Sequence, residues 1–321
     1  MALPIDVRDL MKSGSRFIEE RSQPVRIAVF VEVDAPDALI ETVRDRLRPA
    51  TAAASLQIEV AEIGKAPITA PGTDVVIALA GSGNVGLREA LEGPRRLRLP
   101  VVVAALGDAP REVDVAASLR QPTSDIVVRA EPEEAVDRLG LWLSENLASR
   151  KLALAHNFSF MRAAVAEDAV RTTAWQNGLV GVLTPIPGAD MPIMTANQIK
   201  MLLQIAAAYG QPLNVERVKE LAAVVAGGYL LRALARQTLT VVPVLGWAVK
   251  GALGYTGTIA MGKAAIRYFE AGADLGQLTA YFVTLRDRTA SSLRQRRMRS
   301  QALPPAEDVM LPSPGSDTAG V

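Results

Sequence analysis

The chain has 321 residues, of which 49% are hydrophobic and 4% aromatic, with 35 basic and 34 acidic side chains. Its length allows two ordinary domains, and its near-zero net charge excludes the global field with which a basic protein attracts nucleic acid. Cysteine is absent and His156 is the single histidine, which excludes disulfides, thiolate nucleophiles, cysteine zinc sites and a multi-histidine metal site within one chain.

The first 24 residues predict a leading amphipathic helix that ends at Pro24. Charges stand where a signal peptide needs its apolar core, so we expect a cytoplasmic protein, with the inner face of the cell membrane as a further location.

Residues 25–149 predict an α/β domain with a mostly parallel sheet and flanking helices. Near-continuous apolar runs indicate buried strands, and the alternating run 55–63 indicates an edge strand with one wet face. Helices are expected at residues 36–48, at 87–93 and at 131–148. The buried strands are expected at 25–33, 74–80, 99–106 and 124–130.

Residues 150–290 lose the strand period and predict a helical domain rich in small residues. Gly254, Thr258 and Gly262 fall on one helix face, which allows another helix to approach closely. The helical patterns cover residues 151–168, 193–209, 213–238 and 247–285.

Two interpretations of this apolar region remain open, a soluble helical domain and a membrane-seated or re-entrant module. The interval from Thr172 to Ala189 is uncharged but contains proline breaks, and no interval clearly meets the length that a membrane span needs.

Residues 291–321 form a basic and then proline-rich tail, for which we expect disorder beyond residue 303. The basic cluster suits anionic lipid or a protein partner, and alternatively a solvated helix end. Its candidate patch residues are Arg294, Arg296, Arg297 and Arg299.

One glycine motif matches a dinucleotide fingerprint. Gly81, Gly83 and Gly86 follow a predicted strand and open a helix, and Asp108 lies where a ribose-binding acid is expected. The match falls on an internal strand, and the chain has no plausible hydride-transfer site. We therefore favour a tight strand-to-helix turn and keep the NAD(P) site as the alternative.

A phosphate loop is absent after the first strand. Asp34 and Asp37 stand where its glycines and lysine belong, and both would repel phosphates. The near match that begins at Gly257 and ends in Lys263-Ala264 lies inside a helical pattern, without the hydroxyl that binds magnesium, so we interpret it as coincidence.

Two single residues are candidate functional groups. His156 has no Ser-His-acid partners in the sequence, so a packing or surface role is expected. Asp190 is an acid within an apolar segment, which indicates either a helix cap or a charge that pairs with a partner.

The block that begins at Thr184 carries a family resemblance. A Pro-x-Pro-Gly-Ala-Asp turn is followed by Gln-x-x-Met and a closing Tyr-Gly, with a glycine-rich helix further on. These features resemble the domain of unknown function 697, which is typified by the inner-membrane protein YcjF and also occurs behind Era-like GTPase domains. The signature positions are Pro185, Pro187, Gly188, Asp190, Gln198, Met201, Tyr209, Gly210, Gly254, Gly262 and Tyr268.

The resemblance implies that residues 25–149 are a degenerate GTPase-like domain. The family's guanine-reading Asn-Lys-x-Asp is replaced by Leu106-Gly107-Asp108-Ala109, and the phosphate loop is missing. We therefore expect a non-catalytic scaffold or regulatory protein that is membrane-associated, with no catalytic residues, cofactor or metal, and with a protein partner or self-association. An NAD(P) enzyme and a weak GTP-binding protein are the alternatives.

Overall fold

The computed structural model describes residues 7–119, 125–184, 189–214 and 246–272, together with scattered positions between 216 and 291. Several predicted features lie outside the described residues. They are Pro185, Pro187 and Gly188, most of the helical pattern 213–238, the patch Arg294, Arg296, Arg297 and Arg299, and the tail beyond residue 303.

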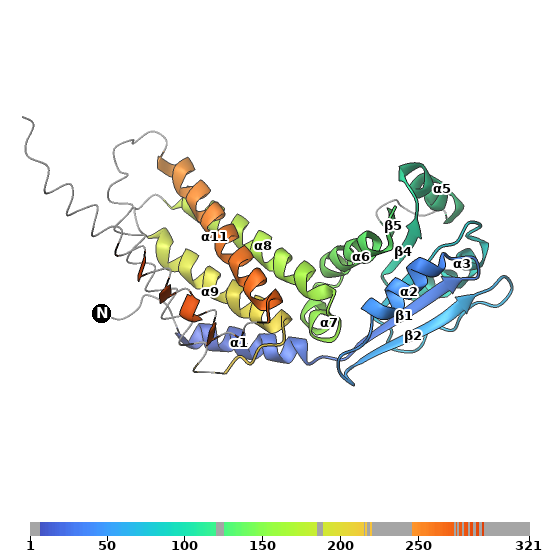
Figure 1. Cartoon of the computed structure of the whole chain (residues 1–321), viewed down its shortest axis with the longest axis horizontal. Helices are drawn as coiled ribbons and strands as arrows, with labels where there is room; N and C mark the ends of the chain where they lie inside the picture. Colours follow the sequence, from blue (N-terminus) through green and yellow to red (C-terminus); the bar gives the residue numbers. More distant parts are fainter. Residues whose placement is uncertain are drawn as a thin grey trace, which may run out of the picture.

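The N-terminal half contains a five-stranded, fully parallel sheet with the order β2-β1-β3-β4-β5 (Figure 1). The predicted α/β class is confirmed, and so is the edge position of the alternating strand, because β2 is outermost. The strands are β1 (Val25–Glu32), β2 (Ala54–Ala61), β3 (Val75–Leu79), β4 (Val101–Leu106) and β5 (Ile126–Arg129).

Helices cover both faces of this sheet. Leu39 and Val43 of α2 and Leu139 of α6 join one apolar core, whereas Leu87 of α3 and Val115 of α5 join the other. Sequence patterning missed α5, which carries only a short apolar stripe. The helices are α2 (Asp37–Arg46), α3 (Val85–Ala90), α4 (Glu92–Arg96), α5 (Ala109–Leu119) and α6 (Pro132–Asn146).

The C-terminal half is helical, as predicted, and α1 (Val7–Arg21) packs with it rather than with the sheet (Figure 1). Lys200 of α9 and Asp9 of α1 form an ion pair, with 2.7 Å between the ammonium and carboxylate. The remaining helices are α7 (Lys151–Asn157), α8 (Met161–Leu183), α9 (Asp190–Ala208) and α11 (Gly246–Glu270).

The single helix predicted over 151–168 is wrong. The structure ends α7 at Asn157 and starts α8 at Met161, and the rings of Phe158 and Phe160 are buried in the interruption. Because these aromatic residues sit at core-facing positions, their apolar spacing resembled a continuous helix. The helix α9 begins earlier than predicted, with Pro192 in its first turn, where a missing backbone N–H costs little.

Candidate functional site

Open parallel sheets bind ligands outside the carboxyl ends of their strands, where the strand order reverses. In this sheet the reversal lies between β1 and β3, since β2 and β3 flank β1 on opposite sides. The chain segments that leave β1, β3 and β4 meet there. We call this region the carboxyl-end site and define it by Glu32, Asp34, Gly81, Ser82, Asp108 and Arg111.

Two carboxylates of the chain accept hydrogen bonds from the loop after β3. The amide of Gly81 donates to Glu32 Oε2 at 2.9 Å, and that carboxylate is buried. The amide of Ser82 donates to Asp34 Oδ2 at 2.8 Å, and the Ser82 hydroxyl donates to the same oxygen. The backbone donors that would face a phosphate in a dinucleotide fold therefore already have anionic partners.

Electrostatics keep Asp34 charged. Hydrogen bonds from the Ser82 hydroxyl and then from the Ser82 amide lower the pKa of Asp34, with a smaller contribution from the amide of Gly83. Hydrogen bonds to an ionised carboxylate favour the ionised form. Asp34 is consequently an anion at neutral pH and would repel a phosphate that approached the same donors.

Arg111 closes the site from α5. Its guanidinium donates to the carbonyl oxygen of Gly81 and, at 3.5 Å, to that of Ser82. Asp108 accepts a hydrogen bond from the Arg111 amide at 3.3 Å, as a residue at a helix start commonly does. The site thus holds three carboxylates and one guanidinium.

The predicted fingerprint residues lie together, but only one of the three glycines has the packing role of the motif. A Cβ on Gly86 would lie 2.5 Å from the Ala61 carbonyl oxygen, so this glycine lets α3 approach β2 closely. A Cβ on Gly81 would collide with Asp34 at 1.8 Å, whereas Gly83 has open space. Position 81 therefore requires glycine because the Asp34 carboxylate occupies the space that a side chain would need.

Ordinary connections also occupy the two positions at which the resemblance implied degenerate GTPase motifs. Only residues 33–36 separate β1 from α2, and Asp37 lies in the first turn of that helix. A phosphate loop takes eight residues, counted from its first glycine through its hydroxyl residue. After β4, Gly107 has φ +148°, a conformation that favours glycine, and the chain enters α5 two residues later.

In the helical half, a buried polar cluster joins three helices. Thr258 of α11 accepts hydrogen bonds from the amides of Asn177 on α8, at 2.9 Å, and Gln198 on α9, at 3.1 Å. Its own hydroxyl donates to the Gly254 carbonyl at 2.7 Å. All three side chains are buried, so the cluster fixes how α8, α9 and α11 pack.

The glycine face predicted on α11 packs against α8. A Cβ on Gly254 would lie 2.8 Å from the Asn177 carbonyl oxygen, and one on Gly262 would lie 2.2 Å from Val170 Cγ2. The two helices therefore approach more closely than side chains at these positions would allow.

The remaining described signature positions also have packing roles. Met201 is buried, and the ring of Tyr209 stacks on Phe269 with centroids 5.5 Å apart. Tyr268 packs at the edge of the same core. Burial, followed by the neighbouring charge of Glu270, raises the pKa of Tyr209 well above its usual value, so its hydroxyl stays protonated and donates to Glu270 at 3.3 Å.

His156 and Asp190 lie at separate places in the helical half. Asp190 begins α9 and is fully buried. His156 lies at the end of α7 beside Gly210, which closes α9 with φ +74°. Burial, followed by the charges of Arg21 and Arg162, lowers the pKa of His156. Its Nδ1 is buried and has no hydrogen-bond partner among the described residues.

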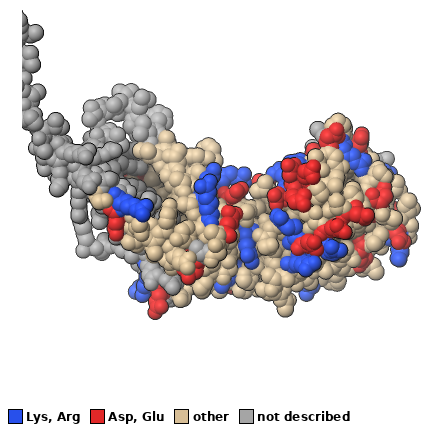
Figure 2. Space-filling model, viewed as in Figure 1, with Lys and Arg blue, Asp and Glu red and all other residues tan. Residues whose placement is uncertain are grey.

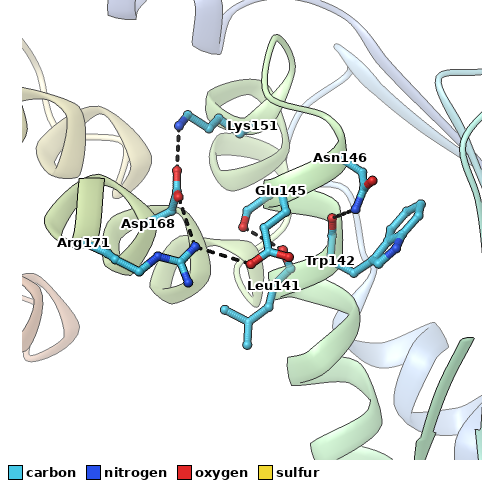
Figure 3. A network of polar contacts seen from close by, with 8 residues as sticks. Leu141, Trp142, Glu145, Asn146, Lys151, Asp168 and Arg171 are labelled. Atoms are coloured by element: carbon cyan, nitrogen blue, oxygen red, sulfur yellow. Dashed lines mark hydrogen bonds and ion pairs between the residues drawn. The ribbon is translucent and has the colours of Figure 1, made fainter. Parts of the chain in front are cut away.

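An ion-pair network joins the two halves (Figure 3). Lys151 of α7 and Arg171 of α8 both contact Asp168, at 2.7 Å and 3.5 Å, and Arg171 reaches Glu145 of α6 at 3.4 Å. A continuous apolar core runs beneath it from the sheet into the helices. No local sequence pattern predicts this network, because its members come from three helices. Asn146 and Ser144 of α6 donate instead to carbonyls of their own helix.

Residues 150–295 match the family described as "Domain of unknown function (DUF697)". This part of the chain belongs to that family. The DUF697 domain thus begins at the residue before α7 and includes the polar cluster and the glycine face. No curated protein matches the chain.

Two further properties of the described residues concern membrane spans and metal sites. None of the helices that the structure describes has the length and hydropathy needed to cross a membrane. Within the same residues, no group of three or more His, Asp or Glu side chains is placed to hold a metal ion.

Proposed function

We propose that the chain is a non-catalytic scaffold or regulatory protein. In this proposal the α/β domain serves as an interaction surface, and the DUF697 domain docks on the surface of a membrane. The proposal that the α/β domain is non-catalytic depends on one observation. The amides of Gly81 and Ser82 already donate hydrogen bonds to Glu32 and Asp34.

A nucleotide phosphate at this site would have to displace Asp34 and leave charged groups without hydrogen bonds. Hydrogen bonds to charged groups are worth about 1.5–3 kcal/mol each, and the incoming phosphate would also meet the negative charges of Glu32 and Asp108. The short connection of residues 33–36 offers no replacement donors of the phosphate-loop type. The geometry therefore favours an α/β domain that does not bind nucleoside triphosphates.

The membrane part of the proposal is supported by an uncharged region of the DUF697 domain. Residues 172–199 and 251–262 contain one ionisable acid, Asp190, and it is buried. Charged side chains gather over the α/β domain and the junction, and part of the helical half shows none (Figure 2). The exposed apolar side chains of this region are Trp175, Leu179, Val182, Leu183, Ile193 and Leu253.

Such a region suits the boundary between headgroups and acyl chains. Trp175 is exposed and packs edge-on against Tyr255, with ring centroids 5.4 Å apart. Tryptophan and tyrosine prefer membrane–water interfaces, and exposed apolar clusters of this kind mark protein or membrane contacts. Contact with one leaflet requires no spanning helix.

Two measurements test the proposal. Isothermal titration with GTP, GDP and ATP in the presence of magnesium should give no binding, and micromolar affinity for any of them would overturn the first part. Flotation with anionic phospholipid vesicles should recover the wild-type chain, and Leu179→Glu with Leu183→Glu should abolish recovery. Val113→Glu on α5, an equally exposed apolar site, is the matched control.

A dinucleotide-binding enzyme remains the second candidate function. It is supported by Gly86, which packs α3 against β2, and by Asp108, which follows the strand next to β3. Thermal shift with NAD(H) and NADP(H) separates the candidates. Because Gly83 has open space, Gly83→Val should fold and should remove any cofactor-induced stabilisation.

A further inference from the structure

A groove with a volume of about 320 Å³ opens between α6, α8 and α11. Pockets for small ligands start at about this size and combine an apolar lining with a few polar groups. Apolar side chains form most of the lining, and they include Leu141 of α6, Val170 of α8 and Ile259 of α11. Figure 3 shows Leu141 and the charged Arg171, which lines the same groove from α8. The groove therefore has the composition that an amphiphilic ligand requires.

Charges of both signs line the groove, and two of them are unpaired within the part of the chain that the structure describes. Asp168 and Arg171 already form ion pairs in the network of Figure 3. Lys263 of α11 and Glu167 of α8 are exposed and form no ion pair with another described residue. The groove thus presents one ammonium and one carboxylate to a ligand that carries both charges. Charge-assisted hydrogen bonds are among the stronger polar contacts.

The cations of the groove lie at the border of the uncharged region that supports membrane contact. Arg171 directly precedes its stretch 172–199, and Lys263 directly follows its stretch 251–262. Lysine and arginine reach lipid headgroups from such border positions, because their long stems lie on apolar surface while the charge stays in the polar layer. When this region contacts a leaflet, both cations therefore lie at the level of the lipid phosphates.

One side of α11 connects this border with the aromatic pair of the same region. Tyr255, Ile259 and Lys263 are four residues apart and all line the groove, over about 12 Å of helix. Tyr255 also packs against the exposed Trp175 of α8, with ring centroids 5.4 Å apart. An apolar track therefore leads from the cationic end of the groove to the aromatic pair that faces the membrane, as the acyl chain of a bound lipid requires.

We propose that this groove binds one phospholipid molecule whose headgroup carries a primary ammonium, as in phosphatidylethanolamine. Lys263 and Arg171 donate hydrogen bonds to its phosphate, and Glu167 accepts hydrogen bonds from its ammonium. An acyl chain lies along Ile259 toward Tyr255. A choline headgroup fits less well, since its quaternary nitrogen has no N–H to donate to Glu167. The inference rests on the proposed membrane contact and names the lipid that the DUF697 domain selects there.

Titration with a soluble lipid tests the groove without a membrane. Dihexanoyl phosphatidylethanolamine, kept below its micelle concentration, should bind the full chain one to one in isothermal titration. Dihexanoyl phosphatidylcholine should bind about fivefold more weakly, because it loses a charge-assisted contact at an exposed carboxylate. Phosphoethanolamine, which has the headgroup charges but no acyl chains, should bind more weakly than either lipid. No binding of the ethanolamine lipid, or equal affinity for any two of the three ligands, would overturn the proposal.

Two substitutions separate the contacts of the phosphate from those of the ammonium. Lys263→Gln should weaken binding of both lipids about fivefold, since both carry the phosphate. Glu167→Gln should weaken only the ethanolamine lipid, so that the two lipids bind equally. Lys12→Gln, at an exposed lysine of α1 outside the groove, is the matched control and should change neither affinity. A preference for ethanolamine that survives Glu167→Gln would contradict the proposed headgroup contact.

Flotation distinguishes a failure of this inference from a failure of the membrane proposal. Leu179→Glu with Leu183→Glu changes side chains outside the groove, so it should abolish flotation and leave binding of the soluble lipid unchanged. Flotation of the wild type without binding of the soluble lipid would overturn the groove assignment alone. Binding of the soluble lipid without flotation would support the lipid site and overturn the docking of the DUF697 domain on a membrane.

Discussion

Asp34 and Ser82 are 48 residues apart in the chain, and the carboxylate of Asp34 accepts hydrogen bonds from both the amide and the hydroxyl of Ser82. This contact links the segments that follow β1 and β3, at the point where the strand order of the sheet reverses. It stabilises the glycine turn from within the chain. In a turn that resembles a phosphate-binding loop, an aspartate of the same chain thus accepts the hydrogen bonds that a phosphate would accept.

The Asp34–Ser82 contact predicts a measurable coupling energy. Asp34→Asn and Ser82→Ala should each lower the free energy of unfolding by about 1 kcal/mol, a value reduced by the exposure of Asp34 to solvent. The double variant should cost less than the sum of the two single variants, since each removes the same contact. Urea unfolding of the four proteins gives the coupling, and strict additivity would show that the hydrogen bonds contribute nothing.

The same contact predicts how acid affects stability. Because the folded pKa of Asp34 lies below its unfolded value near 3.8, its stabilisation is present above that value and is lost as pH falls through the folded pKa. The difference in free energy of unfolding between wild type and Asp34→Asn should therefore become smaller below about pH 4. A difference that stays constant down to pH 2.5 would contradict the assigned pKa direction.

His156 predicts a second pH dependence at milder acidity. Its folded pKa lies below the unfolded value near 6.5, so the unfolded chain binds a proton that the folded chain does not. Stability should decrease as pH falls through about 6.5 and should level off below the folded pKa. His156 is the only histidine, so His156→Gln should flatten the melting temperature between pH 5.5 and 7.5. An unchanged slope would assign the effect to other groups.

The strands were predictable because burial on both faces leaves a local signature. The apolar run of β3 and the alternation of β2 each reflect the environment of that strand alone. The completion of the Gly81 turn was not predictable, since it depends on carboxylates from a different strand. The sequence placed Asp34 after the first strand and predicted that it would repel phosphates, but it could not show which amides that carboxylate binds.

The helical half shows the same limit. The spacing of Gly254, Thr258 and Gly262 correctly predicted a close helix contact, because helical periodicity alone puts them on one face. The partners of Thr258, Asn177 and Gln198, come from two other helices, and no local pattern identifies them. The break near Phe158 was missed for a similar reason, since burial of its ring depends on packing between helices.

The close approach of α8 and α11 predicts opposite effects for two glycine substitutions in one helix. Gly262→Ala should destabilise the chain by about 1–3 kcal/mol, because the new methyl group would overlap Val170. Gly257→Ala faces open space and should stabilise it by about 0.5–1 kcal/mol through the lower flexibility of the unfolded chain. Denaturant unfolding measures both changes. Equal effects would mean that helix propensity, rather than packing, decides at these positions.

The overlap at Gly262 also predicts a rescue. Val170→Ala removes the two methyl groups that a Cβ at position 262 would meet. Combined with Gly262→Ala, it should recover part of the lost stability, so the double variant should cost less than the two single variants added together. An additive double variant would place the strain of Gly262→Ala elsewhere in the helix.

The ion pairs of Figure 3 predict that Asp168 stabilises the DUF697 domain next to the junction, because it pairs with Lys151 and with Arg171, the residue that reaches Glu145 of α6. The side chains of Asp168 and Lys151 are 16% and 23% exposed, so their contact is screened less than a surface pair. Asp168→Asn should lower the free energy of unfolding by about 1–2 kcal/mol, because Lys151 loses its partner in a partly buried position. Glu92→Gln, in the exposed pair with Arg96, should change it by less than about 0.5 kcal/mol. Salt screens a partly buried pair less than a surface pair, so the destabilisation by Asp168→Asn should persist at 0.5 M NaCl. Equal losses for the two variants would mean that the Asp168 pair contributes no more than an exposed surface ion pair.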